Sequence, residues 1–325
     1  MKGRQGALLL IAGFLLFESA LVFVTTSSNR STSDPLRVLA YGSFAASWGP
    51  GPELAEAFRK VCSCEIEIVD GGDAGTLVER LKIEKGKVDV VLGLDSFQLS
   101  RLPPEFLWAE LDSDLTRLGP LAVMDWSPLT FVYRDGEIDP PKSLTDLLKP
   151  QYRRQIALQD PRTSTPGLHF VAWIHSVFGE NTRDYLKKLK PNVHSWSPSW
   201  SAAYGLFKKG QVSLVFTYLT SPIYHWENDG DSRYQPTPLQ EVLPIQWELM
   251  GVPEDAPQKS QALAFLRFLA TPESQKTLMT KNYMFPLSQN VIRGTAFERL
   301  WLSPPTPRLA TDVKPLLQLW EEIVR

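Results

Sequence analysis

The sequence predicts an α/β protein in which two lobes enclose a ligand cleft at a hinge. Apolar runs typical of buried strands, such as Val88–Leu92, alternate with amphipathic segments typical of helices, such as Glu53–Val61. This alternation favours parallel sheets covered on both faces. It occurs in two units, 36–124 and 125–242, within a chain of 325 residues. A later strand candidate, Leu243–Glu248, could return to the first unit, so we expect the chain to cross between the lobes more than once.

The first lobe is expected to span 36–124, with 243–285 returning to it. Its predicted strands are Leu36–Ala40, Ile66–Val69 and Val88–Leu92, and its predicted helices are Glu53–Val61, Thr76–Glu84, Ala262–Leu269 and Glu273–Thr280. A strand-like segment, Val123–Tyr133, leaves this lobe.

The second lobe is expected to span 125–242, joined by a C-terminal segment, 286–325. Its predicted strands are Gln155–Leu158 and Val212–Tyr218, and its predicted helices are Ser143–Leu148, Leu168–Phe178, Thr182–Leu189, Ser201–Lys209 and the terminal Val313–Val324.

One turn of the second lobe, QDPRTSTPGL at 159–168, lies between a predicted strand and a predicted helix. Hydroxyl residues followed by Pro166 are typical of a helix start, because the hydroxyl caps free N–H groups and proline loses no hydrogen bond there. Such a turn presents N–H donors at the carboxyl edge of a sheet, where open α/β folds bind ligands. An ordinary capped helix would also explain these ten residues.

The first 33 residues form an export pattern. Lys2 and Arg4 precede an apolar run, Ala7–Phe17, and a polar stretch follows at 25–33. This is typical of a signal peptide, although no small-x-small cleavage site stands out, so an uncleaved N-terminal anchor stays open. We therefore expect the protein in the periplasm, either free or tethered to the inner membrane.

Composition and motifs exclude several functions. The formal net charge of -2 and the absence of a long basic run argue against a nucleic-acid partner. No nucleophile elbow, zinc motif, phosphate loop or dinucleotide fingerprint occurs. Cys62 and Cys64 form a C-x-C pair that is either a local disulfide or two free thiols. We predict no catalytic residue, no metal site and no cofactor.

Aromatic and acidic residues follow several predicted strands. In a two-lobed α/β protein these strand ends converge on the cleft. Aromatic rings with one or two carboxylates suit a flat, cationic small molecule, because the rings stack and the acid selects for positive charge. The residues noted on this ground are Tyr41, Trp48, Asp73, Ala74, Ser164, Thr165, Trp200, Tyr218, Leu219, Thr220, Ser221, Tyr224 and Tyr283.

Ordered blocks of the sequence resemble the periplasmic thiamine-binding proteins of bacterial ABC importers. The blocks are YGSFAASWGPGP (41–52), the C-x-C-E of Cys62–Glu65, DVVLGLD (89–95), QDPRTSTPGL (159–168), AYGLFKKG (203–210) and TSPIYH (220–225). The resemblance runs from about Val38 to about Pro286. It implies a type II periplasmic binding protein fold, whose two lobes close over thiamine, thiamine phosphate or thiamine diphosphate.

The resemblance also implies which residues form the pocket. The implied positions are Asp73 with Ala74, Ser164 with Thr165, Trp200, the run Tyr218, Leu219, Thr220 and Ser221, and Tyr224. Tyr41 and Trp48 lie in the first matching block. The sequence departs from the family at Ala74, where glycine is usual, at Gly42, where an Asp is usual, at Leu219, where Thr is usual, and at Tyr283, where Trp is usual.

The expected partners are thiamine and the permease and ATPase subunits of an ABC importer, and we expect a monomer. Two alternatives remain. A receptor for ferric ion or a polyamine could use the same fold, although Tyr218 and Tyr224 are not the adjacent pair that iron receptors use. A thiamine-degrading transferase shares the architecture but needs a cleft cysteine, and Cys62 and Cys64 lie at the end of a helix away from the cleft.

Overall fold

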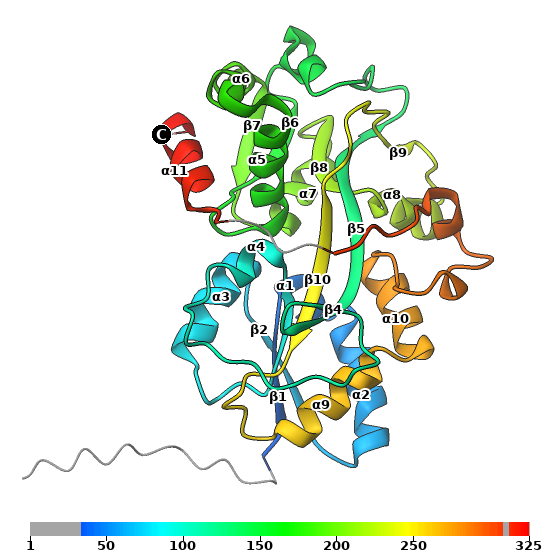
Figure 1. Ribbon diagram of the computed structural model, residues 1–325. Helices are drawn as coiled ribbons and strands as arrows, with labels where there is room; N and C mark the ends of the chain where they lie inside the picture. The colour runs from blue at the N-terminus through cyan, green and yellow to red at the C-terminus, as the bar shows by residue number, and fades with distance from the viewer. Residues whose placement is uncertain (1–33, 308–311, 325) are drawn as a thin grey trace, which may run out of the picture.

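A computed structural model describes residues 34–307 and 312–324. The predicted export segment, 1–33, lies outside the described residues. Two α/β halves are stacked one above the other and joined by long strands that run through both (Figure 1). Each half has its own apolar core. We call the half that contains the first strand lobe 1 and the other half lobe 2.

Lobe 1 is a parallel sheet with helices on its faces. Strand β1 (Leu36–Ala40) lies between β2 (Ile66–Asp70) and β3 (Val90–Leu94), and both pairings are parallel. All of β3 is buried, as expected for a strand covered on both faces. The helices of this lobe are α1 (Gly42–Ala45), α2 (Gly51–Cys62), α3 (Ala74–Ile83), α4 (Ser96–Leu99), α9 (Lys259–Leu269) and α10 (Pro272–Asn282).

Two antiparallel strands connect the lobes. The long strand β5 (Leu121–Arg134) pairs with β10 (Ile245–Gly251) along its first half and with β8 (Leu214–Tyr218) along its second half. Every residue of β5 is buried. Strand β10 also pairs with β3, so the sheet order runs without a break from lobe 1 to lobe 2. The short strands β4 (Arg117–Leu118) and β9 (Tyr234–Pro236) pair with the two ends of β5.

Lobe 2 repeats the parallel arrangement. Strand β6 (Ile156–Gln159) pairs in parallel with β7 (Val193–Ser197) and with β8. Its helices are α5 (Thr165–Phe178), α6 (Thr182–Leu189), α7 (Trp200–Lys208) and α8 (Ser221–Tyr224), which continues as a π-helical turn, His225–Asp229. The predicted helix at Ser143–Leu148 is a short 3-10 turn, Thr145–Leu148, because the stretch is too short to propagate an α-helix.

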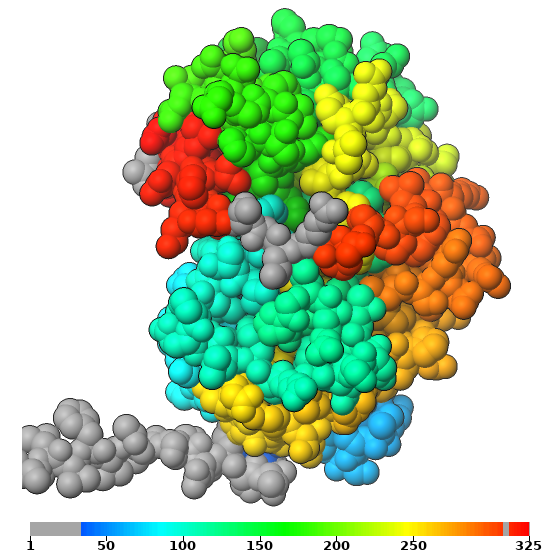
Figure 2. All heavy atoms as spheres, in the orientation of Figure 1, coloured from blue at the N-terminus to red at the C-terminus, as the bar shows by residue number. Residues whose placement is uncertain are grey.

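The C-terminal segment divides between the lobes, which corrects the expectation that all of 286–325 belongs to lobe 2. Phe297 is fully buried in the core of lobe 1, and Trp301 packs against that core. Only the last helix, α11 (Lys314–Val324), packs on lobe 2, with the rings of Trp320 and Trp196 5.3 Å apart. Figure 2 shows this helix on the surface of the upper lobe. Apolar residues before the helix therefore anchor the segment to lobe 1.

The structure joins Cys62 and Cys64 in a disulfide where α2 ends and the chain turns toward β2. The sequence left open a local disulfide or two free thiols, and the structure has the local disulfide. It closes a turn at the far end of α2 and lies outside the cavity described below.

Candidate functional site

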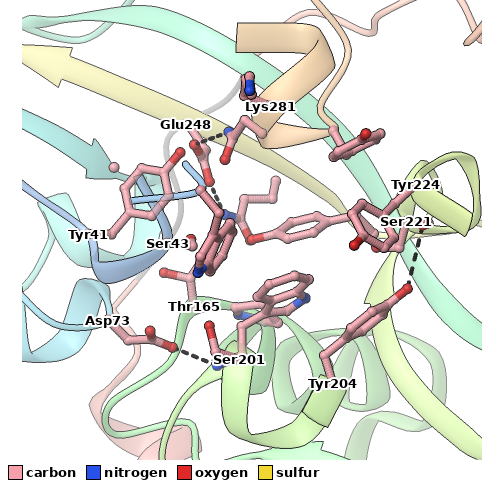
Figure 3. Close-up of a pocket in the computed structure, with 18 of the residues that line it drawn as sticks. Tyr41, Ser43, Asp73, Thr165, Ser201, Tyr204, Ser221, Tyr224, Glu248 and Lys281 are labelled. Atoms are coloured by element: carbon pink, nitrogen blue, oxygen red, sulfur yellow. Dashed lines mark hydrogen bonds between the residues drawn. The ribbon is translucent and has the colours of Figure 1, made fainter. Parts of the chain in front are cut away.

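A cavity of about 800 Å³ lies where the two lobes meet the crossing strands (Figure 3). Its size suits a small organic molecule, and it is far larger than a site for a single ion. Residues from both lobes line it: Tyr41, Ser43, Trp48, Asp73, Ala74, Gly93, Thr165, Pro166, Trp200, Ser201, Tyr204, Gly205, Lys208, Tyr218, Ser221, Tyr224, Glu227, Asn228, Gln246, Glu248, Thr280, Lys281, Asn282 and Tyr283.

All of the residues expected at the ligand site lie along this cavity except Ser164, Leu219 and Thr220. Ser164 is buried directly behind the wall, next to Thr165. Leu219 packs in the core of lobe 1. The Thr220 hydroxyl donates to the backbone carbonyl of Tyr283. Leu219 and Thr220 therefore support the wall from behind, and the expectation that they line the cleft is corrected.

Aromatic rings form one wall of the cavity. Trp200 stacks on Tyr204 with ring centroids 5.0 Å apart and lies 6.2 Å from Tyr218. The Trp200 indole N–H donates to the Thr217 hydroxyl at 2.8 Å, which fixes the plane of the ring. Helix α7 begins at Trp200 because the Ser199 hydroxyl accepts from Ala202 N–H at 3.1 Å. The capped helix start thus presents a flat ring to any ligand.

A second aromatic group closes the opposite side. Tyr224 and Tyr283 meet edge to face, with centroids 5.4 Å apart, and the Asn228 amide donates to the Tyr283 hydroxyl at 2.6 Å. Trp48 is 58% exposed although it lines the cavity, which places it at the mouth. Rings on several sides leave a flat space between them.

One end of the cavity carries hydroxyl and N–H donors. Thr165 is the first residue of α5, and its hydroxyl is buried without a hydrogen-bond partner among the described residues. Ser201 lies in the first turn of α7, also on the cavity. The N–H groups of two helix N-termini, together with these hydroxyls, can donate hydrogen bonds to the hydroxyl or phosphate oxygens of a ligand. Thr165 belongs to the turn at 159–168 that the sequence analysis identified. We call the part of the cavity formed by Thr165, Ser201 and the two helix starts the donor end.

Asp73 lies at the donor end and links the two lobes. It precedes α3 in lobe 1, and its carboxylate accepts the backbone N–H of Trp200 in lobe 2 at 2.9 Å. Burial raises the pKa of Asp73, and the hydrogen bonds from Trp200 and Ser164 oppose that rise. The side chain makes no capping hydrogen bond to its own helix. The carboxylate is thus directed across the cleft.

The other end of the cavity is acidic, and the sequence analysis missed it. Glu248 on β10 lies directly opposite Asp125 on β5, and both side chains are buried. The Asn282 amide donates to Asp125 at 2.9 Å and to Glu248 at 3.3 Å. Within the described part of the chain, neither carboxyl is paired with a lysine, arginine or histidine. We call Glu248, Asp125, Gln246 and Asn282 the acidic end.

Burial controls the protonation of this pair. It raises the pKa of Glu248 from its ordinary 4.5 to about 6, although the Tyr41 hydroxyl and hydrogen bonds from Asp125 and Asn282 oppose the rise. Burial and the charge of Glu248 also hold the pKa of Asp125 well above its usual value. Like charges directly opposite on paired strands destabilise a sheet. The pair therefore retains protons more strongly than ordinary carboxyls do.

Several polar contacts join the lobes beside the cavity. The Gly75 N–H on α3 donates to the Thr163 carbonyl at 2.9 Å, and Arg101 donates to the Arg162 carbonyl at 3.1 Å. His169 on α5 meets Asp95, which follows β3, at 2.9 Å, with both side chains buried. These contacts hold the two lobes together in this structure.

Two features are absent from the described residues. Among residues 34–307 and 312–324, no group of three or more His, Cys, Asp or Glu side chains is arranged to hold a metal ion. In the same ranges, none of the helices combines the length and the apolar character that crossing a bilayer requires.

Two lobes joined by crossing strands, with an aromatic and acidic cavity between them, define a solute-binding protein of the type II periplasmic binding class. The family model described as bacterial extracellular solute-binding protein matches residues 36–283. The chain belongs to this family.

Known relatives and solved structures agree with this assignment. The chain is 34% identical over 283 residues to the thiamine-binding periplasmic protein of Brucella melitensis, covering 84% of this chain and 85% of that protein. It is 35% identical over 276 residues to the protein of the same name from Escherichia coli K12, covering 82% and 84%. A solved periplasmic thiamin binding protein superposes with a TM-score of 0.81 at 32% identity, covering 90% of this chain and 97% of that structure. An iron-bound HitA from Pseudomonas aeruginosa, at 20% identity and a TM-score of 0.69, shows the shared fold alone.

The acidic end predicts an unusual pH dependence of stability. The folded-state pKa of Glu248 is raised from 4.5 to about 6, so the folded state holds its proton more tightly than the unfolded chain does. The stabilisation that comes from this tighter proton binding is complete below pH 4.5 and is lost as the pH rises through about 6. We expect E248Q to raise the free energy of unfolding above pH 7 by about 2 kcal/mol relative to the natural protein.

Urea unfolding of the two proteins at pH 7.5 and pH 4.5 measures this effect. The stability difference should shrink at the lower pH, where Glu248 is protonated in the folded state and about half protonated in the unfolded chain. E273Q, at an exposed acid in the first turn of α10, should not reproduce the pattern. If E248Q were the less stable protein at pH 7.5, ionised Glu248 would be a stabilising group and its electrostatic description would be wrong.

Proposed function

We propose that this protein is an extracytoplasmic receptor that captures thiamine, and also its phosphate esters, and delivers it to an ABC importer. The observation that carries the proposal is a cavity of about 800 Å³ lined by aromatic rings and by the buried Glu248, which has no basic partner among the described residues. Thiamine is flat, carries a permanent positive charge and is small enough for such a space. Relatives that are named thiamine-binding periplasmic proteins share 34–35% of their residues with this chain.

Two interactions would provide most of the selectivity. A cation over an aromatic face gains about 0.5 to 2 kcal/mol, depending on desolvation, and Trp200 and Tyr218 offer such faces. A carboxylate about 4 Å from the cation contributes on the order of 4 kcal/mol before desolvation, at an effective dielectric constant near 20. The rings would therefore select for shape and the acids for charge.

The donor end extends the proposal to thiamine phosphate and thiamine diphosphate. Thr165 and Ser201 at two helix starts could bind a phosphate, with Ser164 directly behind them. The absent acid at Gly42 removes one source of repulsion from that end of the lobe, whereas Asp73 remains. Free thiamine would use the same groups through its hydroxyethyl oxygen.

The competing functions fit the cavity less well. A ferric site would need several ligands converging on one point, whereas Tyr218 and Tyr224 belong to the walls of a large aromatic cavity. A linear polyamine would leave the flat aromatic walls unused. A thiamine-degrading transferase would need a free cysteine in the cleft, but the two cysteines of the sequence are joined to each other outside the cavity.

The proposed setting follows from the family. The receptor would work in the periplasm as a monomer and present its closed form to a permease and its ATPase. Residues 1–33 would direct export, either as a cleaved signal peptide or as an inner-membrane tether. No cofactor is needed, because capture requires only hinge closure: ligand contacts from both lobes favour the closed state.

A fluorescence titration tests the ligand. The tryptophan emission of the purified protein should change with thiamine and saturate at micromolar concentration or lower, because Trp200 and Trp48 line the cavity. Trp200→Ala should weaken binding by roughly 1 kcal/mol or more through the lost stacking contact. A flat titration with folded protein would exclude thiamine as the ligand, and unchanged affinity in the variant would remove Trp200 from the site.

The proposed closure is tested at Gly75. A Cβ built at Gly75 would lie 2.4 Å from the Arg162 carbonyl oxygen and 2.8 Å from the Thr163 Cα, both on the opposite lobe. Gly75→Ala should therefore hinder closure and weaken thiamine binding. It should not weaken the fold, because alanine is the better residue inside a helix by about 1 kcal/mol.

Calorimetric titration and urea unfolding separate the two effects of Gly75→Ala. The expected result is lower affinity together with an equal or greater free energy of unfolding. Undiminished thiamine affinity would show that binding does not require the lobe contact at Gly75.

A further inference from the structure

The acidic end contains more hydrogen-bond acceptors than the protein satisfies. Gln246 lines the cavity and is 3% exposed, and its Oε1 has no hydrogen-bond partner among the described residues. Asp125, paired with Glu248 across the sheet, is 1% exposed and does not itself line the cavity, and its Oδ1 has no hydrogen-bond partner among the described residues. Such buried acceptors are costly unless something donates to them. The end of the cavity therefore requires N–H or O–H donors from a ligand.

Apart from the Tyr41 hydroxyl, the donors that face this end of the cavity are already engaged. The Tyr41 hydroxyl lines the cavity without a hydrogen-bond partner among the described residues, and it can satisfy only one of the acceptors. The Gln246 amide donates to Glu248 at 3.3 Å, and the single Asn282 amide nitrogen serves both Asp125 and Glu248. Lys281, a cation on the cavity wall, lies 3.8 Å from Glu53 and so has an acid of its own. The shortage of donors at the acidic end thus remains in the protein alone.

The two halves of thiamine differ in what they can donate. The thiazolium ring carries the permanent charge but has no N–H group. The aminopyrimidine carries an amino group beside a ring nitrogen, which is a donor next to an acceptor. A carboxyl group matches that edge when one proton is shared between them, because it can then accept from the amino group and complete a hydrogen bond to the ring nitrogen.

On the basis of the function proposed above, we propose that Glu248 binds the amino edge of the pyrimidine and that one proton is taken up from solvent when the complex forms. The proton lies between a Glu248 carboxyl oxygen and the pyrimidine ring nitrogen. The amino group donates to the other carboxyl oxygen. The hydroxyethyl or phosphate group then points toward Thr165 and Ser201 at the donor end, as the positions of the labelled residues in Figure 3 allow.

The surroundings of Glu248 favour holding that proton. Burial raises the pKa of Glu248 to about 6, and no basic residue in the described ranges offsets the charge. The titratable groups that act on it from the neighbouring elements are Asp125 on β5, Asp95 after β3, Tyr41 after β1 and Tyr218 at the end of β8. The charge of Asp95 opposes ionisation of Glu248, whereas the Tyr41 hydroxyl and the hydrogen bonds from Asp125 and Asn282 favour it, and burial outweighs them.

Proton linkage in calorimetry tests the proposal. Thiamine is titrated into the full chain at pH 7.5 in phosphate and in Tris, whose ionisation enthalpies differ, so the difference in binding heat counts the protons exchanged. We expect net uptake that approaches one proton per thiamine. Net release would mean that the thiazolium cation, which favours the ionised carboxyl, faces Glu248. Exchange of no protons would mean that Glu248 shares none with the ligand. Either result overturns the proposal.

Variants make the assignment specific. E248Q should abolish the proton uptake, because an amide takes up no proton at this pH, while its carbonyl and N–H groups can still pair with the amino edge. Glu248→Ala removes both hydrogen bonds and should weaken thiamine binding at least about tenfold, the range expected for a lost hydrogen bond to a charged group. The same variant should bind an N-methylated hydroxyethylthiazolium fragment as the natural protein does, since that fragment lacks the amino edge. E273Q, an exposed acid on α10, should leave both the uptake and the affinity unchanged.

The outcomes separate this inference from the function on which it depends. If the natural protein does not bind thiamine, both fail. If it binds thiamine without proton uptake, only the role of Glu248 fails. Should E248Q fold poorly, the sign of the proton exchange in the natural protein still decides between the two orientations.

Discussion

The antiparallel pairing of β5 with β10 determines most of what this molecule can do. The same ladder joins the lobes and places Asp125 directly opposite Glu248 at the base of the cavity. Two acids on one face of a sheet, with no cation among the described residues to neutralise them, oppose folding. The 14-residue buried strand β5 compensates through extensive apolar packing in both lobes. The structure therefore maintains an electrostatically unfavourable pair where a ligand that supplies hydrogen-bond donors and shares a proton would relieve it.

The cavity is polar at two ends with opposite character, and aromatic between them. Helix starts at Thr165 and Trp200 supply donors at one end, and the crossing strands supply acceptors at the other. The difference follows from the elements themselves, because helix N-termini expose N–H groups, whereas a paired strand has no free backbone donor and acts through its side chains. A ligand with an oxygen-bearing tail and an amine-bearing head would be oriented by this asymmetry alone.

Sequence patterns were sufficient for the architecture because periodicity reports burial directly. The two-lobed α/β fold is confirmed, and the strand candidate at 243–248 does return beside β5. The segment 286–325 was misassigned because its apolar residues before Lys314, such as Phe297, follow no regular period that could tell one core from another.

The donor end and the aromatic walls were predictable from the ends of strands, where turns collect polar residues. A search restricted to the ends of strands does not find the acidic end, because Asp125 and Glu248 lie inside strands. A sequence cue was present in each case, because a single acid occurs in an otherwise apolar run: AVMDW at 122–126 and WELM at 247–250. An acid in a buried strand requires a hydrogen-bonding or charged partner. Where the strand itself supplies no such partner, a ligand is the candidate. Which two such acids face each other depends on strand register, which the sequence alone did not fix.

The contacts between the lobes indicate how ligand binding can control closure. Beside the cavity they are a backbone hydrogen bond from Gly75, hydrogen bonds between backbone groups and the Arg101 and Asp73 side chains, and a buried His169–Asp95 pair. Each apolar core remains mainly within its own lobe. Opening would exchange such bonds for bonds to water, at a net difference of only about 1 kcal/mol each for neutral groups. Separating apolar cores would expose large areas and make opening far more unfavourable. With the lobes balanced in this way, the contacts that one bound molecule would make to Trp200 on one side and Glu248 on the other would be large enough to decide the equilibrium.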